Sequence, residues 1–349
     1  MRVVFYISGH GFGHASRAIE VIEQVAERRP RARIAVRTAV PAEFFARART
    51  TIDLQHADVD TGMVQIDSLR LDVAETARRA AAFYTTFPDR VEREATLLRQ
   101  MGADLVVGDI PPLAFAAAAH AGLPSVAVAN FTWDWIYGAY PEFQTLAPDA
   151  IPTISRAYAT ATCALRLPLH GGFEPMRPVT RDIPFIARRS VRDRRETRRL
   201  LGIEDARPAV LPSFGSYGVR LPLDALARSS RFSIVPGDEA TLRRHGLAYP
   251  DLVAAADVVV SKPGYGIVSE CMANSTALLY SSRGHFIEYD VFVAGMPRFL
   301  RCREIAQEEL LAGRWADAVE AVLGQPSPPG SPRVDGAGVA ADEIVSRCD

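Results

Sequence analysis

Short apolar runs rich in β-branched residues alternate with longer amphipathic stretches along most of this chain. Such alternation is typical of a strand, a crossover helix and a parallel strand, so the sequence predicts an α/β fold. We expect strands at 3–7, 34–38, 52–56, 104–108 and 125–129, and in the second half at 209–212, 232–235, 257–261 and 277–281. Helices are expected to begin near His14, Pro41, Val73 and Pro112, and further helical segments to run through Leu323.

The length of 349 residues favours two domains, each with its own core. Between Leu167 and Arg207 the alternation lapses into a stretch rich in Pro and Gly, followed by an Arg-rich helix that Ser190 can cap. We therefore expect Rossmann-like domains at 1–168 and 207–324, joined by a linker with the Arg-rich helix at 169–206. Residues 325–349 begin with many Pro, Gly and Ser residues and are expected to form a loose tail.

The charge balance argues against nucleic acid or an anionic membrane as the main partner. Forty basic and 41 acidic side chains leave a formal net charge of −1. The exception is a local arginine cluster, which we interpret as a solvated helix face, with binding of an anionic partner as the alternative. Its members are Arg188, Arg189, Arg192, Arg194, Arg195, Arg198 and Arg199.

The cysteines and the apolar runs indicate a cytoplasmic protein. The four cysteines are far apart and form no C-x-x-C pair, which argues against a zinc cluster or a disulfide framework and favours a reducing compartment. No stretch of about 18 uninterrupted apolar residues occurs, so we expect no transmembrane segment. A peripheral membrane contact stays open.

A glycine turn follows the first expected strand, and residues 9–13 alternate Gly with His10 and Phe12. Gly11 and Gly13 permit close approach of the backbone to a ligand, and the helix start offers unpaired N–H groups. A dinucleotide site is disfavoured, because the third glycine comes one position early and no acid follows the second strand. His14 begins the helix and is a candidate general base, since a neutral imidazole can take a proton near pH 7. The alternative is a histidine that only stabilises the turn.

A second glycine turn follows the expected strand at 257–261. Ser261, Lys262, Gly264, Tyr265 and Gly266 lead into a helix whose first N–H groups can accept a diphosphate. Further along this helix, Glu270 can accept both hydroxyls of a ribose. The alternative is a turn that serves only to pack the helix on the sheet, with a surface glutamate.

Two more loops are expected at the same sheet edge. The loop after the strand at 209–212 contains Ser213, Gly215 and Ser216 and can close over phosphates. The loop after the strand at 277–281 contains Arg283 and leads to Glu288, which can bond sugar hydroxyls or merely favour the helix start.

Two possible metal sites are disfavoured. Asp58 and Asp60 form a D-x-D pair, but they lie in the half of the chain opposite to the expected phosphate turn. His10 and His14 are separated by glycines and have no adjacent third ligand. We expect no metal and no resident cofactor.

The motifs resemble those of GT-B glycosyltransferases. The turn ending in His14 and the S-x-x-G-x-x-x-x-x-E pattern of Ser261, Gly264 and Glu270 are similar to the branch of the lipid II N-acetylglucosaminyltransferase. Closer still, residues 9–17, 106–112 and 130–137 resemble the glycosyltransferase-like N-terminal domain of plant L-arabinokinase. The resemblance covers nearly the whole chain. The sugar-kinase half of arabinokinase has no counterpart here, so kinase activity is not expected.

The resemblance implies an acceptor-binding N-terminal domain and a C-terminal domain that binds a nucleotide diphosphate sugar, facing each other across a cleft. It implies His14 as the base and Asp109 as its orienting partner. The acceptor side would be lined by Asn130, Trp133, Trp135 and Tyr137, for which ordinary packing is the alternative. The lipid II enzyme's paired glutamines are replaced by Glu288 and Tyr289, which leaves the donor sugar undetermined.

The expected function is inverting, metal-independent transfer of a sugar from a UDP-linked donor to a hydroxyl. Two alternatives stay open: a nucleotide-sugar epimerase or hydrolase on the same scaffold, and a domain that binds nucleotide sugars without catalysis.

Overall fold

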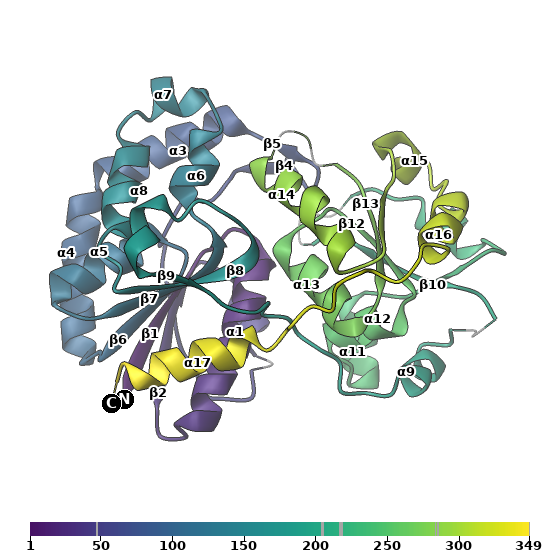
Figure 1. Ribbon diagram of the computed structural model, residues 1–349, viewed down its shortest axis with the longest axis horizontal. Helices are drawn as coiled ribbons and strands as arrows, with labels where there is room; N and C mark the ends of the chain where they lie inside the picture. Colours follow the sequence, from purple (N-terminus) through teal and green to yellow (C-terminus); the bar gives the residue numbers. More distant parts are fainter. Residues whose placement is uncertain (47, 204–205, 216–218, 283, 285, 349) are drawn as a thin grey trace. The chain divides into compact units, whose positions relative to one another are not determined.

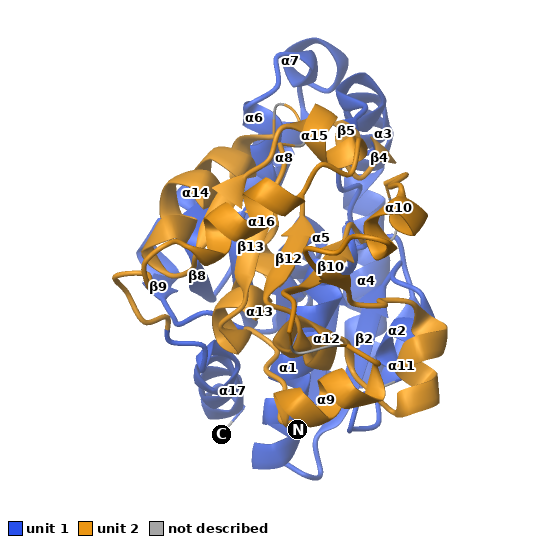
Figure 2. Cartoon of the chain, turned by 90° about the vertical axis from the view of Figure 1, so that its right-hand side faces the viewer, with its two compact units in different colours: residues 1–65, 71–186, 333–349 blue, residues 66–70, 187–332 orange. Residues whose placement is uncertain are grey.

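The computed structural model describes all residues except 47, 204–205, 216–218, 283, 285 and 349. The described residues divide into two compact units, shown in different colours in Figure 2. Unit 1 comprises Met1–Gln65, Leu71–Ile186 and Arg333–Asp349, and unit 2 comprises Ile66–Arg70 and Ala187–Pro332. The α/β prediction is confirmed in both units, each of which contains a parallel sheet.

Unit 1 is built on a seven-stranded sheet in the order β3-β2-β1-β6-β7-β8-β9, as far as the described residues show. The inner strand β1 is fully buried from Val3 onward, as expected for a sheet covered on both faces. Its strands are β1 (Arg2–Ile7), β2 (Arg33–Thr38), β3 (Asp53–His56), β6 (Leu105–Asp109), β7 (Ser125–Phe131), β8 (Cys163–Gly171) and β9 (Thr180–Asp182).

Helices cover both faces of this sheet. Figure 1 shows α1 and α17 side by side on one face, and α4 and α5 on the other. The helices of unit 1 are α1 (Phe12–Arg28), α2 (Ala42–Phe45), α3 (Val73–Thr85), α4 (Phe87–Met101), α5 (Pro112–Ala121), α6 (Trp133–Gly138), α7 (Glu142–Leu146), α8 (Ala150–Tyr158), the 3₁₀ helix η1 (Glu174–Val179) and α17 (Gly336–Ser346).

Unit 2 is built on a five-stranded sheet in the order β11-β10-β12-β13-β14, again within the described residues. The strands are β10 (Ala209–Ser213), β11 (Ser233–Ile234), β12 (Val258–Ser261), β13 (Ala277–Tyr280) and β14 (Cys302–Glu304). The helices are α9 (Arg194–Leu200), α10 (Leu223–Ala227), α11 (Glu239–His245), α12 (Tyr249–Ala255), α13 (Tyr265–Asn274), α14 (Ile287–Gly295), the 3₁₀ helix η2 (Met296–Arg298), α15 (Gln307–Leu311) and α16 (Ala316–Leu323).

A hairpin from the first half of the chain contributes to unit 2. Its strands are β4 (Gln65–Asp67) and β5 (Arg70–Leu71), which pair with each other. Leu69 joins the apolar core of unit 2, and the Ser68 hydroxyl donates to the Phe214 carbonyl at 2.5 Å. No pattern in the sequence predicts this contribution.

The stretch expected to be a linker differs from the expectation of 169–206. Residues 169–186 belong to unit 1, because β8 pairs with β7 and β9 pairs with β8, which extends the sheet through the Pro-rich segment. The Arg-rich helix α9 begins only at Arg194 and is capped by Asp193, whose carboxylate accepts from the Glu196 N–H. Ser190 is not the cap, since its hydroxyl donates to Asp251.

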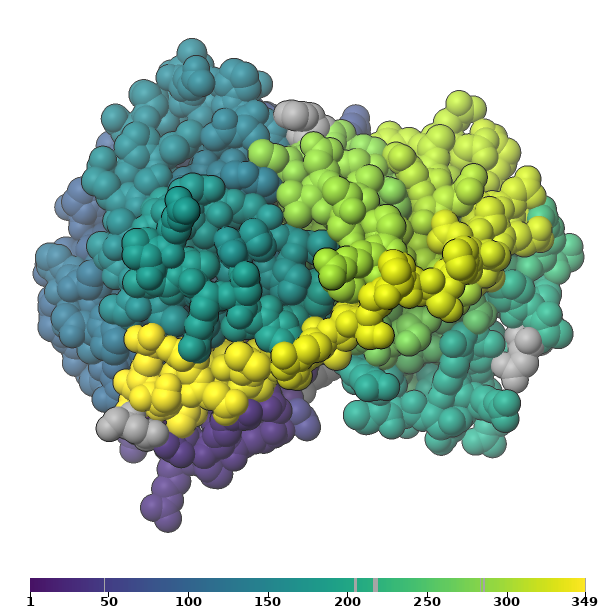
Figure 3. Space-filling model, in the orientation of Figure 1, coloured from purple at the N-terminus to yellow at the C-terminus, as the bar shows by residue number. Residues whose placement is uncertain are grey.

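The tail expected to be loose contains the ordered helix α17. Ala340, Ala341 and Ile344 on this helix are fully buried, and the helix packs along α1 within unit 1. The yellow atoms of α17 lie against the purple atoms of α1 in Figure 3. The helix begins at Gly336, at the end of the stretch 325–337 whose high Pro and Gly content led to the expectation of a loose tail.

Candidate active site

The turn after β1 begins where the strand order of unit 1 reverses. Strands β2 and β3 lie on one side of β1, and β6, β7 and β8 lie on the other. In open parallel sheets, ligands bind outside the carboxyl ends of the strands at this switch point. The N–H of Ser8, at the end of β1, donates to the carbonyl of Asp109, the last residue of β6, at 2.8 Å. The sequence therefore brings its first glycine turn to the ligand-binding edge of the sheet.

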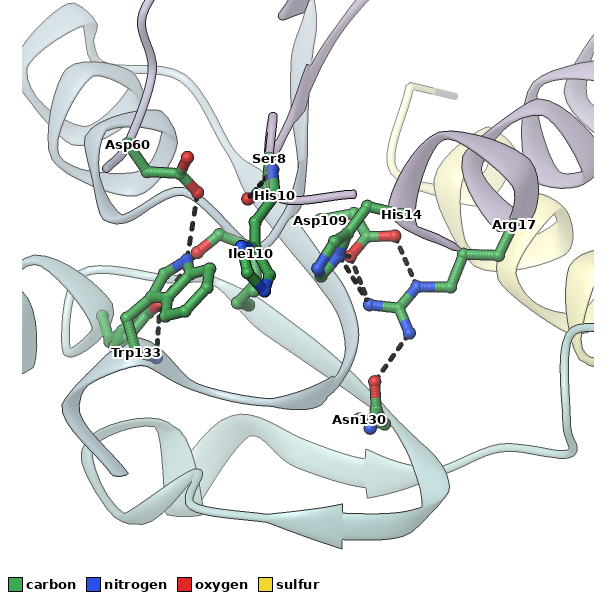
Figure 4. Close-up of polar contacts among 10 residues, drawn as sticks. Ser8, His10, His14, Arg17, Asp60, Asp109, Ile110, Asn130 and Trp133 are labelled. Atoms are coloured by element: carbon green, nitrogen blue, oxygen red, sulfur yellow. Dashed lines mark hydrogen bonds and ion pairs between the residues drawn. The ribbon is translucent and has the colours of Figure 1, made fainter. Parts of the chain in front are cut away.

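His14 and Asp109 meet at this edge, in a cluster that also contains Arg17 and Asn130 (Figure 4). His14 Nδ1 lies 2.8 Å from Asp109 Oδ1. Arg17 donates from Nε to Asp109 Oδ2 at 2.6 Å and from Nη2 to Oδ1 at 2.5 Å, while its Nη1 donates to Asn130 Oδ1 at 2.6 Å. All four residues are at least nine-tenths buried.

The charges in this cluster determine the tautomer of His14. Burial acts to raise the pKa of Asp109, but the Arg17 guanidinium and His14 outweigh it and hold that pKa below its ordinary value. Two groups lie near His14 Nδ1: the Asp109 carboxylate, which only accepts, and Arg17 Nη2 at 3.0 Å, which only donates. Because Arg17 Nη2 already donates to Asp109 Oδ1 over the shorter distance of 2.5 Å, we assign the proton of the 2.8 Å contact to His14 Nδ1. The other ring nitrogen, Nε2, is then a proton acceptor.

His10 is fixed in the opposite tautomer. Its Nδ1 accepts from the Met63 N–H at 3.1 Å, so Nε2 carries the proton when the ring is neutral. The ring packs closely on Gly62, where an added Cβ would lie 2.8 Å from the His10 Cβ, and its edge meets the Trp133 ring at a centroid distance of 5.5 Å.

Asp60, part of the D-x-D pair that was disfavoured as a metal site, lies close to the cluster around His14 (Figure 4). Trp133 Nε1 donates to Asp60 Oδ2 at 3.0 Å. Burial raises the pKa of Asp60, and hydrogen bonds from Ser8, Trp133 and the Gly9 N–H together with His14 act against that rise. Its partner in the motif, Asp58, is exposed.

The residues expected on the acceptor side have three different surroundings. Asn130 belongs to the cluster around Arg17. Trp133 and Tyr137 are fully buried and stack on each other, and the Tyr137 hydroxyl donates to the Gly62 carbonyl at 2.8 Å. Trp135 is partly exposed and packs on Gly171, where an added Cβ would lie 2.3 Å from its ring. The side chains of Trp133 and Tyr137 thus have a packing role.

The second glycine turn also begins at a switch point. In unit 2, β11 lies on one side of β10 and β12 on the other, and Ser213 and Ser261 are register partners at the carboxyl ends of these strands. The Ser261 hydroxyl donates to the Ser213 carbonyl. Lys262, Gly264, Tyr265 and Gly266 follow directly, and α13 begins at Tyr265.

Gly264 is the N-cap of α13 and leaves open space at the helix start. Its φ of −161° is extended backbone that any residue can adopt, and no described atom lies within 4 Å of an added Cβ. Neither conformation nor packing within the described residues requires glycine here. The site therefore has room for a group that approaches the first N–H groups of the helix.

Glu270 lies on α13 as expected, but its contact was not foreseen. Its side chain is buried, and Oε1 accepts from Arg188 Nε at 2.6 Å and lies 2.5 Å from Arg188 Nη2. Burial raises the pKa of Glu270, while Arg188 opposes the rise. The interpretation of Arg188 as part of a solvated face is wrong.

The rest of the arginine cluster is also only partly solvated. Arg194 and Arg198 pair with Asp257, and Arg192 donates to the Gly246 carbonyl at 2.8 Å. Arg189, Arg195 and Arg199 are exposed, in accord with the solvated interpretation.

The remaining expected donor residues are placed as follows. Gly11 (φ +77°) and Gly215 (φ +68°) adopt the left-handed conformation that favours glycine, and neither has a described atom within 4 Å of an added Cβ. Gly13 lies in the first turn of α1, and Glu288 is buried in the first turn of α14. Ser216 and Arg283 lie outside the described residues.

The described residues contain no group of three or more His, Cys, Asp or Glu side chains arranged to hold a metal ion. Within the same residues, no helix is both long enough and apolar enough to cross a membrane.

The chain resembles known proteins in its sequence and in its fold. No family model matches the chain. L-arabinokinase of Arabidopsis thaliana is 31% identical over 334 residues, a match that covers 90% of this chain but 31% of that protein. The chain thus spans about a third of the length of the curated relative it matches.

Solved glycosyltransferases share the fold over nearly the whole chain. The glycosyltransferase of kitacinnamycin has a TM-score of 0.63 at 15% identity. The match covers 99% of this chain and 98% of that one. Phytolacca americana UGT2, in complex with UDP-2-fluoroglucose and pterostilbene, has a TM-score of 0.56 at 12% identity, with 94% of that chain and 99% of this one covered. The chain has the two-domain α/β fold of the GT-B glycosyltransferases.

Proposed function

We propose that this chain is a glycosyltransferase that moves a sugar from a UDP-linked donor to a hydroxyl acceptor with inversion and without a metal ion. Unit 2 would bind the nucleotide, and unit 1 would bind the acceptor and supply the base. The GT-B fold and the likeness to an arabinokinase support this assignment at the level of sugar chemistry.

The observation that carries the proposal is the hydrogen bond between His14 and Asp109 at the switch point of unit 1. With Nδ1 donating to an ionised carboxylate, Nε2 can take the proton of an acceptor hydroxyl. The hydroxyl oxygen then bonds to the anomeric carbon as the bond from that carbon to the phosphate oxygen breaks. The electron pair leaves with the nucleoside diphosphate, and Asp109 balances the charge of the imidazolium that forms.

The departing diphosphate needs stabilisation, for which α13 is suited. Its N-terminus follows Gly264 at the switch point of unit 2, and the first turn contains no acidic residue. Backbone N–H groups and the partial positive charge of the helix start can bind a diphosphate. This arrangement supports a reaction that does not depend on a metal.

Release of UDP from a panel of UDP-sugars, with and without hydroxyl acceptors, tests the proposal. We expect acceptor-dependent release by the wild type, no release by His14→Ala, and nucleotide binding by both. His120→Ala is the matched control, because His120 is exposed at the end of α5 and pairs with Glu92. Full activity of His14→Ala would remove the assigned base.

The same assay separates the alternatives. An epimerase or hydrolase would consume a UDP-sugar without any acceptor, whereas a binding domain would bind UDP-sugar and release no UDP with any acceptor. Activity that is abolished by EDTA and restored by a divalent cation would contradict metal independence.

A further inference from the structure

Arg188 and Glu270 form a two-donor ion pair in unit 2, in which the carboxylate is buried. Both Nε and Nη2 of Arg188 reach the same carboxylate oxygen, Oε1, at 2.6 and 2.5 Å. The Glu270 side chain is 4% exposed and that of Arg188 is 24% exposed. Among the described residues, the second oxygen of Glu270, Oε2, has no hydrogen-bond partner. Oε1 thus accepts from Arg188, and Oε2 is left as an acceptor for a ligand.

The position of Arg188 is fixed independently of this ion pair. The Asn274 side-chain amide, at the end of α13, donates to the carbonyls of both Arg188 and Glu270 and accepts from the Ser190 N–H. The Arg188 guanidinium also lies over the Tyr249 ring, 5.7 Å from its centroid. These contacts hold the segment 188–190 against α13 before any ligand binds.

Glu270 and the glycine turn lie on one face of α13. Gly266 and Glu270 are four residues apart, and such residues share a helix face about 6 Å apart along the axis. This separation is similar to the length of the link between the diphosphate and the ribose of a nucleotide. A diphosphate at the helix N-terminus would therefore bring its ribose close to Glu270.

We infer that Arg188 is a positioning residue for nucleotide recognition, which holds Glu270 by Oε1 so that Oε2 accepts a ribose hydroxyl. This inference rests on the proposed nucleotide site in unit 2. Without the guanidinium, the Glu270 carboxylate would be a buried charge without a counter-ion and free to rotate about its side chain. The arginine therefore provides both the charge balance and the orientation.

Titration calorimetry with UDP and 2′,3′-dideoxy-UDP measures the ribose contact directly. For the wild type we expect the dideoxy nucleotide to bind at least about tenfold more weakly, since hydrogen bonds to charged groups contribute about 1.5–3 kcal/mol. Arg188→Gln should bind the two nucleotides within about threefold of each other. The ratio of the dissociation constants of dideoxy-UDP and UDP summarises each comparison. Arg188→Lys keeps the charge but cannot reproduce the two-donor contact, so its ratio should lie between those of the wild type and Arg188→Gln.

Two further variants distinguish positioning from a general loss of structure. Arg189→Gln removes an adjacent, exposed arginine and should keep the wild-type ratio. Arg188→Gln combined with Glu270→Gln removes both charges, so folding is preserved without a buried unpaired carboxylate, and the ratio should stay near one. Circular dichroism of each variant verifies the fold.

The outcomes separate this inference from the proposed function. A wild type that binds neither UDP nor any of ADP, GDP and CDP would overturn the proposed function and this inference with it. Equal binding of UDP and dideoxy-UDP by the wild type would overturn the inference alone. An Arg188→Gln variant that weakens both nucleotides equally, and so keeps the wild-type ratio, would show that Arg188 contacts the phosphates instead.

Discussion

His14 Nδ1 lies 2.8 Å from Oδ1 of Asp109, and this carboxylate is shared with Arg17. Asp109 therefore balances one cation permanently and a second one whenever His14 gains a proton. Its buried position makes both interactions strong, because the local dielectric constant is low.

Asp109→Asn should lower kcat by about 100-fold or more, because the neutral amide no longer balances the imidazolium. UDP affinity should stay unchanged, since Asp109 lies in unit 1 and the proposed nucleotide site in unit 2. Steady-state kinetics and calorimetry on the same preparation measure both values. A kcat within a few-fold of the wild type would contradict the assigned role.

A control is needed because Asp109→Asn leaves Arg17 buried without its carboxylate, which costs about 3–5 kcal/mol in comparable ion pairs. Combining Asp109→Asn with Arg17→Met removes the unpaired charge. We expect the double variant to recover stability in a thermal unfolding experiment but not activity. Recovery of both would indicate that the loss in the single variant was structural.

The sequence predicted the elements that position the site because buried parallel strands have a strong apolar signal. Predicted strands at 3–7 and 104–108 correspond to β1 and β6, and their neighbouring carboxyl ends bring His14 to Asp109. Arg17 was detectable in principle, since it follows His14 by three residues on one helix face. Its contact with Asn130, 113 residues away, depends on the sheet order, which the sequence does not state.

The ion pair of Arg188 and Glu270 was not predictable for a similar reason. The two residues are 82 positions apart, and Arg188 stands in a run of arginines whose composition resembles a solvated surface. Arg188 is distinguished from the other arginines of this run by the hydrogen bond from Asn274, which holds its backbone against α13. Contacts made by loops and linkers have no periodicity, so pattern analysis does not detect them.

Gly264→Val should weaken UDP binding by at least about tenfold, roughly the loss of one charge-assisted hydrogen bond. The added side chain would enter the open space at the N-terminus of α13, where the proposed diphosphate lies. Stability should fall by only about 1 kcal/mol, the difference between Gly and Val at an N-cap. Calorimetry and thermal unfolding measure the two effects.

Gly138→Val is the matched control for this substitution. Gly138 also has no described atom within 4 Å of an added Cβ, but it lies at the end of α6 in unit 1. UDP affinity should be the same as in the wild type. Unchanged UDP affinity in Gly264→Val as well would place the diphosphate elsewhere.

The raised pKa of Asp60 should make the stability of the folded chain depend on pH. Burial raises its pKa in the folded chain, in spite of hydrogen bonds from Ser8, Trp133 and the Gly9 N–H. The folded state therefore binds the Asp60 proton more tightly than the unfolded state does. The resulting stabilisation is fully present below the ordinary aspartate pKa of about 3.9 and is lost as the pH rises through the higher folded value.

Asp60→Asn removes this dependence, because an amide does not titrate while its oxygen can still accept from Trp133 Nε1. We expect the free energy of unfolding of the wild type to fall relative to that of Asp60→Asn as the pH increases from 3 to 7. Urea unfolding at a series of pH values measures the difference, and the other titrating groups cancel because both chains contain them. Asp58→Asn, which removes the same charge at an exposed position, controls for net charge. The contrary outcome is a wild type that gains stability relative to Asp60→Asn as the pH increases from 3 to 7. It would mean that a cation compensates the Asp60 carboxylate. Among the described contacts of Asp60, His14 is the one group that could supply that positive charge.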